Sequence, residues 1–79
     1  MSPTIFRYKG YRFYFFSREE ERMHVHVMHA DGEAKIWIQP RVELCSSVGL
    51  SSKQLKEIID KVSERQHDIE QSWKDHFGQ

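Results

Sequence analysis

The sequence has a single cysteine, no net charge and no long hydrophobic run, and each of these features excludes a class of protein. One thiol, Cys45, cannot form a disulfide within the chain or supply a cysteine-rich zinc site, and it suits a reducing compartment. The apolar runs are far shorter than a membrane-spanning helix and no secretory leader opens the chain, so we expect a cytoplasmic protein. The 12 basic and 12 acidic residues are balanced along the chain, which argues against a broad electrostatic surface for nucleic acid.

The chain of 79 residues is long enough for one domain, which we expect to span residues 1–79. Its five Phe, three Tyr and two Trp can fill a compact core and still leave aromatic surface. A net charge of zero does little to keep molecules apart, so the composition also favours self-association.

The first half of the chain, residues 4–45, has the alternating pattern of strands. Four stretches are typical of strands, namely residues 4–8, 11–16, 23–30 and 33–39. Glycine favours the tight turns that would join them at Lys9-Gly10 and Asp31-Gly32, and the second pair predicts a type I′ turn. These features predict an antiparallel sheet of four strands.

Three shorter segments complete this half of the chain. Residues 17–22 are charged and predict a solvated loop, and Pro40 ends the fourth strand because it cannot donate to a strand ladder. Val42 and Leu44 predict a short edge strand, which would make the sheet five-stranded.

The second half of the chain predicts one long helix over residues 52–77. Ser51 and Gln54 match a capping box at its start, and Gly78 is a natural terminator. An apolar stripe recurs at helical spacing, with Gln66 as an interruption. Its members are Leu55, Ile58, Ile59, Val62, Ile69, Trp73 and Phe77. The predicted fold is therefore α+β, with one face of the sheet packed by a single long C-terminal helix.

The second hairpin decides which way its side chains face. A two-residue turn pairs Ala30 with Glu33, and the other pairs follow from this register. They are His24 with Gln39, Val25 with Ile38, His26 with Trp37, Val27 with Ile36, Met28 with Lys35 and His29 with Ala34. Opposed residues share a face of the sheet, so the aliphatic residues seat the helix, and His29 lies near their rim.

The other face is predicted to be a binding surface, because a single helix covers only one face. Arg12 resists burial, which places it and Tyr14 on this side as well. The predicted binding surface consists of Arg12, Tyr14, His24, His26, Met28, Lys35 and Trp37.

The motifs of the chain also resemble a known family. They are the strand His24-Val25-His26-Val27, the segment from Ala34 to Pro40, Gly49 with Ser51 and Leu55, and the closing Trp73 and Phe77-Gly78. This pattern resembles the small bacterial proteins of the domain of unknown function 4160 family. The chain departs from it at Arg22-Met23, where relatives often have proline.

The resemblance implies a small bacterial cytoplasmic protein. Relatives are often encoded beside another small protein, which implies toxin–antitoxin-like pairing. The resemblance implies no established activity, so it assigns no catalytic residue.

Three functions fit the predicted binding surface. The first is protein interaction, by a homodimer or with a small cognate partner, because Trp, Tyr, Met, His and Arg are typical of interfaces. Under this interpretation the protein is not an enzyme.

The second is metal binding. His24 and His26 lie two residues apart on one strand, so their imidazoles could chelate zinc, nickel or copper, but the spacing identifies no third ligand.

The third is metal-independent cleavage of RNA, as in a ribonuclease-like toxin. One imidazole would accept a proton and the other donate one, with Arg12 or Lys35 stabilising the phosphate. Trp37 and Tyr14 could stack on unpaired bases.

Overall fold

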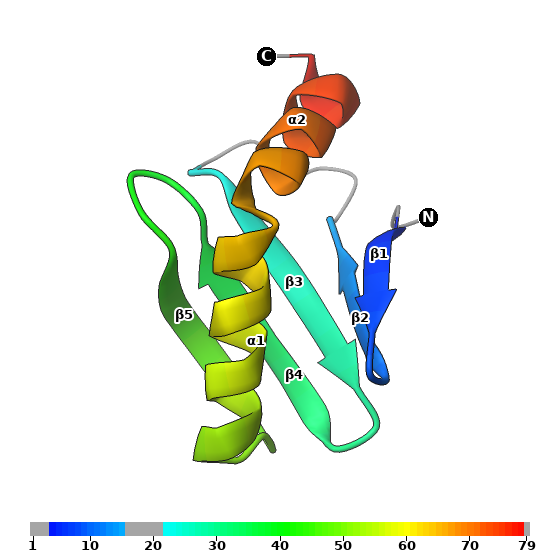
Figure 1. Ribbon diagram of the computed structural model, residues 1–79, viewed down its shortest axis with the longest axis vertical. Coiled ribbons are helices and arrows are strands. Elements are labelled where there is room, and N and C mark those ends of the chain that lie inside the picture. Colours follow the sequence, from blue (N-terminus) through cyan, green and yellow to red (C-terminus); the bar gives the residue numbers. More distant parts are fainter. Residues whose placement is uncertain (1–3, 16–21, 79) are drawn as a thin grey trace.

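The computed structural model describes residues 4–15 and 22–78, which form five strands and two helices (Figure 1). In chain order they are β1 (Thr4–Tyr8), β2 (Tyr11–Tyr14), β3 (His24–His29), β4 (Gly32–Trp37), β5 (Glu43–Val48), α1 (Ser52–Glu64) and α2 (Gln66–Phe77). The strands form one antiparallel sheet in the order β1-β2-β3-β4-β5. The α+β fold and the antiparallel sheet are thus as predicted. Residues 17–21 of the predicted loop, and residue 16 of the predicted second strand, lie outside the described residues.

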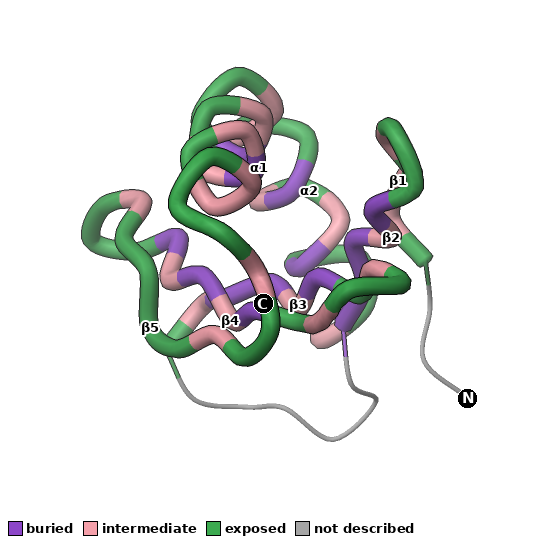
Figure 2. Tube along the Cα trace, turned by 90° about the horizontal axis from the view of Figure 1, so that it is seen from below, coloured by how far each residue is buried: buried purple, intermediate pink, exposed green. Residues whose placement is uncertain are grey.

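Both helices lie on one side of the sheet, and the core fills the space between the two layers (Figure 2). Alternation along β2 sends the side chains of Tyr11 and Phe13 to this side, and Phe15 follows them; all three are buried. Aliphatic residues of β3, β4, α1 and α2 complete the core, together with Trp73. No helix in the described part of the chain is long and apolar enough to span a membrane.

The register of the β3–β4 hairpin differs from the prediction by two residues. His29, not Ala30, is the last residue of β3 to pair, and its partner is Gly32. The turn therefore lies at Ala30-Asp31, and neither residue has the positive φ that a type I′ turn requires. A shift of two residues keeps every side chain on its predicted face, because the pleat has a period of two.

The shifted register changes the cross-strand neighbours of the histidines. His26 lies opposite Lys35, and His24 lies opposite Trp37. Met28 lies opposite Glu33, a residue that the prediction had paired with Ala30.

The fifth strand exists and is longer than predicted. The predicted edge strand was placed at Val42 and Leu44, whereas β5 continues through Ser46 and Ser47. A bulge interrupts its pairing with β4 between Lys35 and Ile36, since Lys35 pairs with Ser46 and Ile36 with Leu44. Backbone pairing with β4 therefore outweighs the weak strand propensity of the serines.

The prediction of a single long helix is wrong, because the helix breaks at Arg65. The backbone there has φ −104° and ψ 18°, outside the helical region. The break falls where the apolar stripe is interrupted by Gln66, whose side chain amide reaches the carbonyl of Ile38 at 3.5 Å. The predicted capping box at Ser51 is present, with the Gln54 amide donating to the Ser51 hydroxyl at 3.1 Å.

Candidate functional site

The side of the sheet away from the helices carries an ordered grid of side chains. Cross-strand pairing joins Arg12, Met28, Glu33 and Val48 in one row across β2, β3, β4 and β5. The next row joins Tyr14, His26, Lys35 and Ser46. We call these eight residues and Trp37 the open face. Arg12 pairs with Met28 and Tyr14 with His26, which places both on the predicted side of the sheet. Tyr14 is nevertheless buried, with 6% of its surface exposed.

His24 does not belong to this accessible surface, although the sequence predicted it there. Its side chain is only 1% exposed and packs against the indole rings of Trp37 and Trp73, with ring centroids 5.7 and 5.3 Å away. Its Nδ1 atom lies 2.7 Å from the carbonyl oxygen of Arg22. The prediction failed because α2 brings Trp73 to the end of the sheet where β3 begins.

Cations stack on the aromatic rings of the open face. The guanidinium of Arg12 lies 4.6 Å from the centre of the Tyr14 ring. Trp37 is approached by two cations, Arg22 at 4.4 Å and Lys35 at 4.7 Å. Such contacts hold long side chains in place, so this positive charge is presented from fixed positions.

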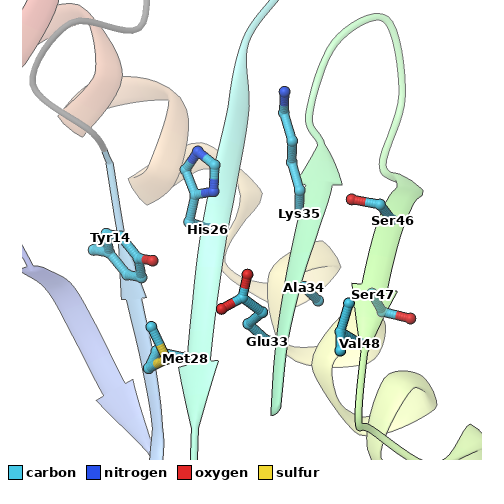
Figure 3. A pocket seen from close by; sticks show the side chains of 9 residues that line it. All are labelled: Tyr14, His26, Met28, Glu33, Ala34, Lys35, Ser46, Ser47 and Val48. Atoms are coloured by element: carbon cyan, nitrogen blue, oxygen red, sulfur yellow. The ribbon is translucent and has the colours of Figure 1, made fainter.

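A groove of about 330 Å³ runs across the open face (Figure 3). Its lining residues are Tyr14, His26, Met28, Glu33, Ala34, Lys35, Ser46, Ser47 and Val48. The Tyr14 hydroxyl and the Glu33 carboxylate point toward each other across β3, with the His26 ring beside them (Figure 3). The groove thus combines apolar surface with a carboxylate, an ammonium group, an imidazole and hydroxyl groups.

The electrostatics of the groove keep Tyr14 protonated. Burial of its phenol raises the pKa above the ordinary 10.0, the Glu33 carboxylate raises it further, and the Arg12 guanidinium opposes them. Tyr14 also stacks on His26, with ring centroids 5.5 Å apart. Near neutral pH its hydroxyl therefore keeps its proton, which makes it a hydrogen-bond donor and a poor base.

The two charged residues of β4 in the groove are not neutralised within the described chain. Glu33 and Lys35 make no hydrogen bond or ion pair with any residue in 4–15 and 22–78. Arg22, the second cation beside Trp37, forms an ion pair with Glu43, with 3.4 Å between the charged groups. Glu33 and Lys35 are thus available to charged groups of another molecule.

The geometry gives little support to a metal site at His24 and His26. Their ring centroids are 4.9 Å apart, but His24 is buried and its Nδ1 atom contacts a backbone carbonyl. Among residues 4–15 and 22–78, no group of three or more His, Cys, Asp and Glu side chains could hold a metal ion. Zinc needs three or four protein ligands, and the described residues do not bring them together.

A family model described as a domain of unknown function (DUF4160) matches residues 10–74. The chain belongs to this family. The matched segment contains every residue of the open face. Comparisons with curated proteins and with solved structures found no match.

The predicted binding surface of this DUF4160 member lacked three residues of the open face: Glu33, Ser46 and Val48. Glu33 could have been found, because it alternates with Lys35 and Trp37 along one strand and must share their face. Ser46 and Val48 gave no such signal, since their side depends on the bulge in β5. The single cysteine, Cys45, is exposed on this edge strand.

Proposed function

We propose that this DUF4160 protein is an interaction module that binds another protein chain through its open face. The observation that carries the proposal is the exposure of Met28 and Val48 in one row on either side of Glu33. Their exposed fractions are 40% and 70%, on a face that no described element covers. Apolar side chains grouped in this way on a small domain are typical of a surface that another molecule covers.

The composition of the open face also supports this function. Trp, Tyr, Met and Arg are the residue types enriched in the buried centres of protein interfaces. Here Trp37 is held by two cations, so a partner meets a ring that has already lost much of its freedom. A toxin–antitoxin-like component, as the family resemblance implies, would use the face in this way.

The edges of the sheet are less suited to binding than its face. β1 has an irregularity between Thr4 and Phe6, and β5 has one opposite Lys35 and Ile36. Bulges interrupt the row of backbone groups that an added strand would need, and native proteins use them to protect edges. We therefore assign the interaction to side chains of the open face.

Photo-crosslinking in cells tests the proposal. A photoreactive amino acid replaces Met28, and a matched control replaces Ser63, which is exposed on α1. We expect a crosslinked product of one defined mass from position 28 and none from position 63, and Trp37→Ala should reduce its yield. No product from position 28, or equal products from both positions, would contradict the proposal.

A second candidate is acid–base cleavage of RNA, which is favoured by the position of His26 between Tyr14 and Lys35 in one groove. The buried His24 cannot reach a substrate there, so His26 would act with a second group of the groove. Purified protein should then cleave single-stranded RNA with a bell-shaped dependence on pH, and His26→Ala should abolish cleavage. Intact RNA after prolonged incubation would remove this candidate.

A further inference from the structure

Glu33 and Lys35 are opposite charges placed one pleat apart on the same strand. Both side chains stand on the open face, and their Cα atoms are about 6–7 Å apart because a strand rises about 3.3 Å per residue. Neither forms an ion pair within residues 4–15 and 22–78. The Lys35 ammonium lies 4.7 Å from the centre of the Trp37 ring. The Lys35 side chain points away from Glu33, so the two charges do not neutralise each other (Figure 3).

The surroundings of these charges determine what can cover them. Glu33 lies between the exposed apolar side chains of Met28 and Val48. A partner that buries those two side chains also removes the carboxylate from water, which is costly unless a cation meets it. The same holds for Lys35 and an anion. The partner must therefore present a positive and a negative group with the spacing of Lys35 and Glu33.

A second copy of this chain meets that requirement. Consider two open faces packed together and related by a two-fold axis that lies between the sheets and runs across the strands. If the axis passes midway between Glu33 and Lys35, each Glu33 faces Lys35 of the second copy. The row Arg12, Met28, Glu33, Val48 then packs on the row Tyr14, His26, Lys35, Ser46 of the second copy. This places an anion opposite a cation twice, once on each side of the axis.

Resting on the proposed function, we infer that the open face binds a second copy of this chain, face to face, through reciprocal Glu33–Lys35 ion pairs. Sheets packed in this way lie about 10 Å apart with their strand directions within about 30°, so the rows can interdigitate. The chain carries 12 basic and 12 acidic residues, and its net charge of zero adds no general repulsion between copies.

Charge reversal tests the pairing directly. Glu33→Lys makes both charges positive and Lys35→Glu makes both negative, so each variant alone should dimerise at least about 100-fold more weakly than the natural chain. A mixture of the two variants should recover a heterodimer, because every Lys then faces a Glu. The double variant Glu33→Lys/Lys35→Glu should recover a homodimer. Masses are measured by analytical ultracentrifugation, and circular dichroism confirms that each variant is folded.

Lys53→Glu is the matched control, since it reverses an exposed charge on α1 and should leave the dimer unchanged. A monomeric natural chain at high concentration, or dimers that survive both single reversals, would overturn the inference. The crosslinking experiment separates this inference from the proposed function. No crosslinked product from position 28 would contradict the proposed function. A product that joins this chain to a chain of different sequence would support the proposed function and contradict only the inference that the partner is a second copy.

Discussion

The imidazole of His24 packs against the indole of Trp73, with ring centroids 5.3 Å apart and an interplanar angle of 64°. Trp73 also meets the ring of Phe15 edge-on at 5.3 Å, so one side chain joins α2 to β3 and to the end of β2. This contact explains why the first histidine of the pair is buried while the second, His26, faces the groove.

Trp73→Ala should strongly destabilise the protein. The indole is 2% exposed, and removing a buried Trp costs about 3–5 kcal/mol of the free energy of unfolding, because it leaves a cavity. Urea unfolding of the natural chain and the variant measures the difference. Trp73→Phe keeps part of the packing and should lose less. A cost below about 1 kcal/mol for the alanine variant would show that α2 is not held by this contact.

The two histidines should separate stability from binding. His24→Ala removes a buried ring that contacts two tryptophans and a backbone carbonyl, so it should cost about 2 kcal/mol or more. His26 lines the groove, so His26→Ala should keep the free energy of unfolding within about 0.5 kcal/mol of that of the natural chain. The same substitution should weaken dimerisation. Urea unfolding and ultracentrifugation of the same two variants give the comparison. Equal effects of both variants on stability would contradict this division.

Gly32→Ala should be poorly tolerated, because a Cβ atom at Gly32 would lie 2.0 Å from the carbonyl oxygen of Val48. The backbones of β4 and β5 would have to separate at this point. Gly78→Ala is the control: its φ of 73° costs about 1–2 kcal/mol in strain, but nothing lies within 4 Å of the added atom. Thermal unfolding should therefore show a larger loss for Gly32→Ala than for Gly78→Ala, and the reverse order would contradict the close approach.

Alkaline pH should weaken the fold through Tyr11. Burial raises the pKa of its phenol above 10.0, and the carboxylate of Glu57, which accepts its hydrogen bond at 3.3 Å, raises it further. Because the pKa of Tyr11 is higher in the folded state, its contribution to the free energy of unfolding is complete below pH 10.0. This contribution is lost as the pH rises through the pKa of the folded state. Urea unfolding across this range should give a flatter decline for Tyr11→Phe. A decline identical to that of the natural chain would assign the effect to other groups, including Tyr14.

The alternation of side chains along each strand was determined by the sequence alone. Because opposite faces follow from a pleat of period two, Val25 and Val27 were correctly sent to the core and His26 and Trp37 to the other side, even with the hairpin register wrong by two residues. The capping box at Ser51 was also predictable, because it depends only on residues within one helical turn.

Tertiary structure decided how much of each face is exposed. The break at Arg65 lets α2 carry Trp73 to the end of the sheet, and only that packing buries His24. The bulge in β5 likewise sets Val48 beside Glu33 on the open face. The sequence therefore predicts that His24 and His26 share a face of the sheet, but not that His24 is buried. Burial depends on which distant element packs above a residue, and strand alternation carries no information about that element.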